Sequence, residues 1–133
     1  MLTLYVYRQM DKIDWLPFIK AAIERNPVCI NDLSGKNSSD VYDILKNMSE
    51  ESVYDGTRLA LPDEVWNFRR GDGIEKAILL ADFLQYNDHS TPILISIRKK
   101  EVILKTNENE FHFTSDKNLK KSILITGTSY KIS

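Results

Sequence analysis

A capped helix places the strongest constraint on what this chain can fold into. The segment RRGDGIEKAILLADFL runs from Arg69 to Leu84, and within it Asp72 and Glu75 have the spacing of a capping box. Apolar residues then recur at helical spacing, namely Ala77, Leu80, Ala81 and Leu84. The sequence therefore predicts a helix over residues 72–86 that packs one face into the protein core.

The first turn of this predicted helix carries no side chain that could act as a nucleophile. Backbone N–H groups at a helix start favour negative charge, and enzymes use that environment to activate a thiolate or to bind a phosphate. Here Gly71 and Gly73 flank Asp72, and that turn has no thiol or hydroxyl. Glycine lets another backbone or a ligand approach closely. The missing nucleophile is the main clue to function.

Composition and charge exclude several classes of protein. The chain has 133 residues, of which 42% are hydrophobic and 28% charged, as expected of one globular domain over residues 1–133. Its net charge of −1 does not indicate binding to nucleic acid or to a membrane. The charge is uneven, with −5 over residues 1–90 and +4 over residues 91–133. This asymmetry indicates either two complementary solvated surfaces or a basic binding face.

Cysteine and histidine are too scarce for a disulfide framework or a metal centre. Cys29 is the single cysteine, and His89 and His112 are the two histidines, far apart in the sequence. No segment reaches the roughly 18 apolar residues of a membrane span. No nucleotide-binding or zinc-finger motif is present. We therefore expect a cytoplasmic protein with no metal, no cofactor, no nucleic-acid partner and no membrane partner.

The order of predicted elements indicates an α+β fold. Helices are predicted over residues 14–25, 38–48, 62–68 and 72–86, with a turn-rich stretch at 31–39. Strands are predicted over residues 2–7, 93–97, 101–106, 110–115 and 122–130, with polar connections at 98–100, 107–109 and 116–121. Helices followed by strands are typical of an α+β domain. We expect N-terminal helices followed by an antiparallel meander that packs on the central 72–86 helix.

The text GDGIEKAILLADFL resembles the transglutaminase-like branch of the papain-like cysteine-enzyme superfamily. Gly71 and Asp72 match the Gly-Asp of its Gly-Asp-Cys turn, and Gly73 stands where the family has its catalytic cysteine. His112, on a later predicted strand, lies about where the resemblance places the general base. The resemblance implies a transglutaminase-like core, with the capped helix against the sheet.

Two departures from the family pattern imply a catalytically inactive relative. Gly73 has no side chain and cannot attack a carbonyl. The acid nearest after His112 is Asp116, and no Asp or Glu follows it, so no clear triad forms. The resemblance then implies that the remnant cleft near Gly73 and His112 binds a peptide or protein segment, as a binding or scaffolding module.

Other residues around the helix start have two interpretations each. Arg69 and Arg70 could hold an anionic ligand against it, or could pair with the acidic residues Asp63, Glu64 and Asp72. Gly73 itself could simply be what the tight turn requires. The candidate binding residues are Arg69, Arg70, Asp72, Gly73 and His112.

Two alternative functions belong to other classes. In the first, Cys29 is a displaced nucleophile and His112 is its base, which makes the protein a cysteine hydrolase or acyltransferase. Cys29 lies between the apolar Val28 and Ile30, so the competing interpretation is a small buried residue. The second alternative is an unrelated α+β protein with a structural or interaction role.

Overall fold

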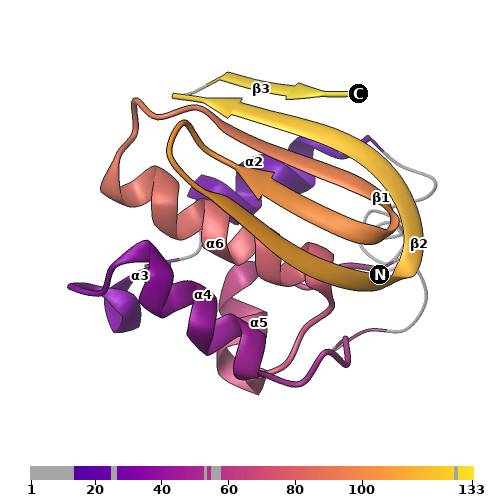
Figure 1. Ribbon diagram of the computed structural model, residues 1–133, viewed down its shortest axis with the longest axis horizontal. Coiled ribbons are helices and arrows are strands. Elements are labelled where there is room, and N and C mark those ends of the chain that lie inside the picture. The colour runs from indigo at the N-terminus through magenta and orange to yellow at the C-terminus, as the bar shows by residue number, and fades with distance from the viewer. Residues whose placement is uncertain (1–13, 25–26, 53, 55–57, 128) are drawn as a thin grey trace.

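The fold is α+β, as predicted. The computed structural model describes residues 14–24, 27–52, 54, 58–127 and 129–133, so the strand predicted over residues 2–7 lies outside the described residues. The helices are α2 (Leu16–Glu24), α3 (Pro27–Leu33), α4 (Ser38–Asn47), α5 (Pro62–Phe68) and α6 (Gly73–Asn87). The strands are β1 (Ile93–Lys105), β2 (Glu110–Thr126) and β3 (Ser129–Ile132), which form one antiparallel sheet in the order β1-β2-β3. α6 and α2 lie behind the sheet in Figure 1.

Helix α6 begins with the predicted capping box. The Asp72 carboxylate accepts a hydrogen bond from the Ile74 backbone N–H at 3.0 Å, and the Glu75 carboxylate accepts one from the Asp72 N–H at 2.7 Å. The prediction that only one face of the helix is buried was wrong, because every residue from Gly73 to Phe83 is buried. α6 contacts the sheet on one side and the other helices around the rest of its surface. It is therefore the centre of the fold rather than an amphipathic cover.

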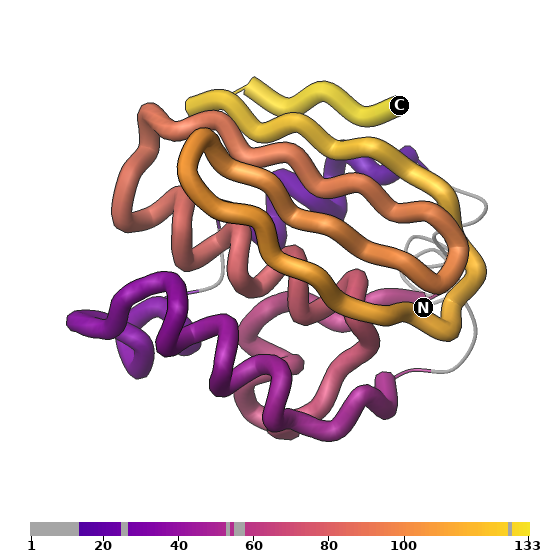
Figure 2. Tube along the Cα trace, viewed as in Figure 1, coloured from indigo at the N-terminus to yellow at the C-terminus, as the bar shows by residue number. Residues whose placement is uncertain are grey.

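Strands β1 and β2 each double back, and both turns lie within the polar connections predicted over residues 98–100 and 116–121. β1 turns at Lys99, which has a φ of 58°, and β2 bends at Asn118, which has a φ of 56°. The register shifts at the same place: Lys99 pairs with Leu119, whereas Glu101 pairs with Thr114. Four residues of β2 therefore pass around a single residue of β1. Figure 2 shows the long arch of β2 around the turn of β1.

The result is a Greek-key order, and the predicted meander was wrong. The first half of β1 pairs with the second half of β2, and the second half of β1 pairs with the first half of β2. The two halves of β1 lie side by side, because Ser96 and Arg98 line the same pocket as Ile103 and Lys105. In space the strand segments follow the order 119–126, 93–99, 101–105, 110–114, in which the last segment in sequence returns to pair with the first.

The sheet has one buried and one open face. Side chains alternate along both strands, and the inner face supplies buried residues to the core, namely Ile93, Ile95, Ile97, Val102, Leu104, Phe111, Phe113, Ile123 and Ile125. On the outer face of the same strands the side chains are exposed or half-buried. None of the helices in the described ranges is long and apolar enough to cross a membrane.

Candidate functional site

The start of α6 is packed against β2 and leaves no cleft at Gly73. A Cβ atom on Gly73 would lie 2.6 Å from the carbonyl carbon and 2.8 Å from the amide nitrogen of Thr114. Real Cβ atoms do not approach backbone so closely, and a strand backbone cannot move aside like a flexible side chain. The expectation of a remnant cleft at Gly73 is therefore contradicted. Glycine is required at this position because the backbone of β2 occupies the space.

Asp72 joins the helix start to the same strand. One carboxylate oxygen caps α6, and the other accepts a hydrogen bond at 2.9 Å from the backbone N–H of Asp116. Asp72 is only 3% exposed, so both oxygens are used and neither faces solvent. Its role is to fasten α6 to β2, which leaves no free acceptor for a ligand.

The imidazole of His112 lies on the outer face of the sheet, away from α6. Its Nε2 lies 3.3 Å from the Glu110 carboxylate, and about half of its side chain is exposed. The flanking Phe111 and Phe113 face the core, as the alternation predicts. Since Gly73 is buried on the inner side, the sequence-predicted pair of Gly73 and His112 does not form one site.

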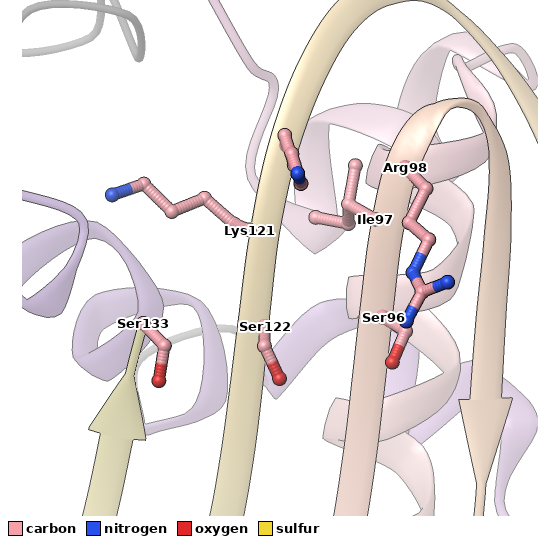
Figure 3. Close-up of a pocket in the computed structure, with 7 residues that line it drawn as sticks. Ser96, Ile97, Arg98, Lys121, Ser122 and Ser133 are labelled. Carbon is pink, nitrogen blue, oxygen red and sulfur yellow. The ribbon is translucent and has the colours of Figure 1, made fainter.

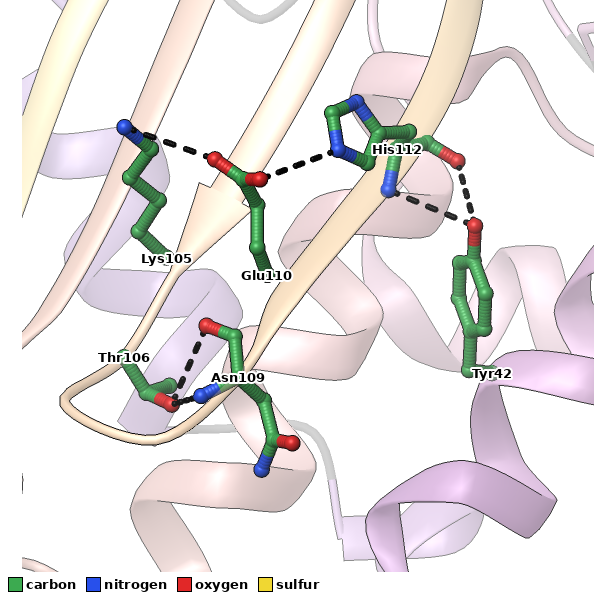
Figure 4. A network of polar contacts seen from close by, with 6 residues as sticks. All are labelled: Tyr42, Lys105, Thr106, Asn109, Glu110 and His112. Atoms are coloured by element: carbon green, nitrogen blue, oxygen red, sulfur yellow. Dashed lines mark hydrogen bonds and ion pairs between the residues drawn. The ribbon is translucent and has the colours of Figure 1, made fainter.

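Tyr42 closes the edge of β2 at His112. Its hydroxyl donates to the His112 carbonyl oxygen at 3.0 Å and accepts from the His112 backbone N–H at 3.3 Å, so it replaces a neighbouring strand (Figure 4). The Tyr42 ring also packs against the rings of Phe111 and Phe113, at centroid distances of 5.0 and 5.4 Å. The surroundings of the His112 backbone are thus structural.

The two arginines before α6 do not converge on a common ligand position. Arg69 has a φ of 55°, and its guanidinium stacks 3.6 Å from the centre of the Trp66 ring. Arg70 instead forms an ion pair with Glu51 at 3.7 Å. Neither arginine therefore forms the expected pairing with Asp63, Glu64 or Asp72. The two side chains also do not come together as an anion site at the start of α6.

Cys29 is buried among carboxylates, which contradicts its expected role as a nucleophile. It lies in the first turn of α3, a helix that was not predicted from the sequence and that ends within the stretch 31–39 expected to be turn-rich. The Asp63 carboxylate caps this helix by accepting from the N–H groups of Val28 and Cys29 at 3.2 and 2.9 Å. Burial, then the charges and hydrogen bonds of Asp82 and Asp63, raise the pKa of the Cys29 thiol.

The helix start does not activate Cys29, because carboxylates already occupy its surroundings. The thiol lies 3.5 Å from the Asp82 carboxylate in the helical layer, fully buried, whereas the His112 ring is exposed on the outer face of the sheet. The proposed pair of Cys29 and His112 is therefore not formed.

A row of three serines crosses the outer face of the sheet. Ser96 of β1 pairs with Ser122 of β2, and Ser122 exchanges backbone hydrogen bonds of 2.9 and 3.1 Å with Ser133. Figure 3 shows the three side chains pointing to the same side. They line a pocket of about 440 Å³, which we call the serine pocket, formed by Ser96, Ile97, Arg98, Lys120, Lys121, Ser122 and Ser133.

The side chains that line the serine pocket include three cations and no aspartate or glutamate. Arg98 and Lys120 lie directly opposite each other on β1 and β2. Within the described ranges, no carboxylate lies within ion-pair distance of Arg98, Lys120 or the nearby Lys131. Lys121 points away from the serines, toward the ring of Trp15 at 6.0 Å (Figure 3). Like charges placed opposite each other across a sheet are destabilising unless an anion lies between them.

Glu110, farther along this face, is already neutralised. Glu110 is 3.4 Å from the Lys105 ammonium and 3.3 Å from His112. The hydrogen bond from Lys105 lowers the pKa of Glu110. A second pocket of about 260 Å³ continues the same surface and is lined by Ser96, Arg98, Glu101, Ile103 and Lys105. The free positive charge of this face is therefore concentrated around the serine pocket.

Sequence reasoning missed the serine pocket, although one signal pointed to it. The charge of +4 over residues 91–133 indicated a basic face as one of two alternatives. The three serines come from separate segments, and only the strand register brings them into one row. The described part of the chain nowhere gathers three histidine, cysteine, aspartate or glutamate side chains that could hold a metal ion.

Comparisons of the chain with protein-family models, with curated proteins and with solved structures found no match. The chemistry of the candidate site therefore comes from its geometry alone.

Proposed function

We propose that this protein is a non-catalytic binding module that holds an acidic protein segment on the outer face of its sheet. The observation that carries the proposal is the Arg98–Lys120 pair, two cations placed opposite each other in a pocket that serine hydroxyls also line. An acidic segment would relieve this repulsion and would gain charge-assisted hydrogen bonds.

The distribution of charge supports an acidic ligand. Lys99 and Lys100 extend the positive surface at the turn of β1, and Lys131 extends it on β3. All three side chains are exposed. A surface of one sign of charge speeds the encounter with an oppositely charged partner and loses that advantage as salt rises.

The proposal keeps the peptide ligand expected from the transglutaminase-like resemblance but moves the site. The resemblance itself stays a prediction, and so does the inactive state that it implied. A ligand has room on the outer face of the sheet but not at the start of α6. The Thr114 backbone fills the position next to Gly73, whereas the serine pocket is open.

A charge-removal experiment tests the proposal. The double variant Arg98→Gln/Lys120→Gln should bind a fluorescent glutamate-rich peptide at least about tenfold more weakly than the unmodified protein, by anisotropy at low salt. The matched control Lys20→Gln/Lys36→Gln removes the same charge from exposed helix and loop positions and should leave binding nearly unchanged. Equal losses in both variants, or no binding by the unmodified protein, would overturn the proposal.

A further inference from the structure

The centre of the serine pocket has the dimensions of a single phosphoryl group. Ser96 pairs with Ser122, and two residues along the strands Arg98 pairs with Lys120. These four residues, which we call the quartet, stand at the corners of a patch about 5 Å by 7 Å, given the usual strand spacing and rise. Two corners are hydroxyls and two are cations. A phosphoryl group can reach all four corners from one central position.

The hydroxyls of the quartet are available to a ligand. No hydrogen bond joins the Ser96 or Ser122 hydroxyl to any other residue of the described ranges, and both side chains are half-buried rather than fully solvated. Figure 3 shows the Arg98 guanidinium on the same side as the Ser96 hydroxyl. Arginine offers a planar fork of N–H donors that suits phosphate, and hydroxyls donate to the remaining oxygens.

We infer that the quartet binds a phosphoryl group carried by the acidic segment, as on a phosphoserine or phosphothreonine side chain; this inference rests on the proposed function. A phosphate monoester has three acceptor oxygens and a charge of about −2, whereas a carboxylate has two oxygens and one charge. The quartet offers more donors than a carboxylate can use. Phosphorylation would therefore raise the affinity of an already acidic segment.

The rest of the outer face favours a peptide over a continuous polyanion. Glu101 is exposed on this face beyond Arg98 and would repel a nucleic-acid backbone or an anionic membrane laid across it. Leu94 and Leu124 pair on the other side of the serine row and are half-buried, which suits an apolar side chain next to the phosphorylated residue.

Three peptides of one design test the inference by titration calorimetry. They are a glutamate-rich peptide with a central serine, the same peptide phosphorylated at that serine, and a charge-matched peptide in which added glutamates replace the phosphate charge. The phosphopeptide should bind at least about tenfold more tightly than the charge-matched peptide, the equivalent of one strong charge-assisted hydrogen bond.

Variants of the quartet distinguish specific recognition of the phosphoryl group from electrostatic attraction of any acidic peptide. Ser96→Ala/Ser122→Ala and, independently, Arg98→Lys should bring the two affinities together, because the phosphopeptide loses more affinity than the glutamate peptide does. Ser34→Ala is the matched control, because Ser34 is exposed in the loop between α3 and α4, outside the serine pocket, and it should keep the preference. Far-ultraviolet circular dichroism confirms that each variant is folded.

Each outcome decides between the two proposals. Equal affinity of the phosphopeptide and the charge-matched peptide would overturn the phosphoryl site and leave the acidic-segment function standing. A failure of all three peptides to bind would overturn both. Tighter binding of a short single-stranded oligonucleotide or of phosphatidylserine vesicles than of the phosphopeptide would overturn the peptide as ligand.

Discussion

At the scale of single residues, Asp82 couples folding to pH. It lies within α6, is 3% exposed, and accepts a hydrogen bond from the Cys29 thiol at 3.5 Å. Burial raises the pKa of Asp82 to about 8, since removal from water disfavours the charged carboxylate. The unfolded chain has the ordinary value near 3.8. Between these values the folded protein holds a proton that the unfolded chain has released.

This difference predicts how stability depends on pH. The stabilisation from protonated Asp82 is complete below about pH 4 and is lost as pH rises through about 8, by an amount on the order of a few kcal/mol. The free energy of unfolding, from urea titrations, should therefore be more favourable at pH 5 than at pH 9 in the native protein.

Asp82→Asn should flatten much of this dependence, because the amide cannot ionise and still accepts from Cys29. Asp43→Asn, on the exposed side of α4, is the control and should leave it unchanged. A pH profile that Asp82→Asn does not alter would show that Asp82 is ionised in the folded protein.

At the scale of elements, contact between α6 and β2 makes Gly73 irreplaceable. Gly73→Ala should lower the free energy of unfolding by about 3 kcal/mol or more, because the new methyl group overlaps the Thr114 backbone. Gly71→Ala places its Cβ 3.1 Å from a Val65 methyl group, which can shift, so the cost should be nearer 1 kcal/mol. Urea unfolding of both variants measures the difference, and equal costs would contradict the packing described here.

Tyr42 gives a second test at this scale, where α4 meets the edge of β2. Tyr42→Phe keeps the ring packing on Phe111 and Phe113 but removes the hydroxyl that serves both backbone groups of His112. The loss should be about 1 kcal/mol, with faster hydrogen exchange at the His112 amide. Unchanged exchange at that amide would mean that Tyr42 does not protect this edge.

At the scale of the whole molecule, the sequence determined the local elements better than their arrangement. The capping box of α6 and the alternation around His112 were predicted because both depend on neighbours in sequence. The turns within β1 and β2 lie in the polar connections predicted over residues 98–100 and 116–121, but the pairing of residues 93–99 with 119–125 was missed, because polar connections do not determine which strands become neighbours. The serine pocket was missed for the same reason, since long-range register creates it.

Because β1 and β2 each double back, their two sets of strand pairings should form in a definite order during folding. The pairing of residues 101–105 with 110–114 closes a loop of only a few residues, whereas the pairing of 93–99 with 119–125 must enclose that whole hairpin. Short loops close sooner than long ones, so we expect the inner hairpin to form first. The quartet belongs entirely to the late, outer pairing. A newly made chain would therefore form the proposed binding surface only in the last stage of folding, and a partner that binds this surface would recognise only fully folded molecules.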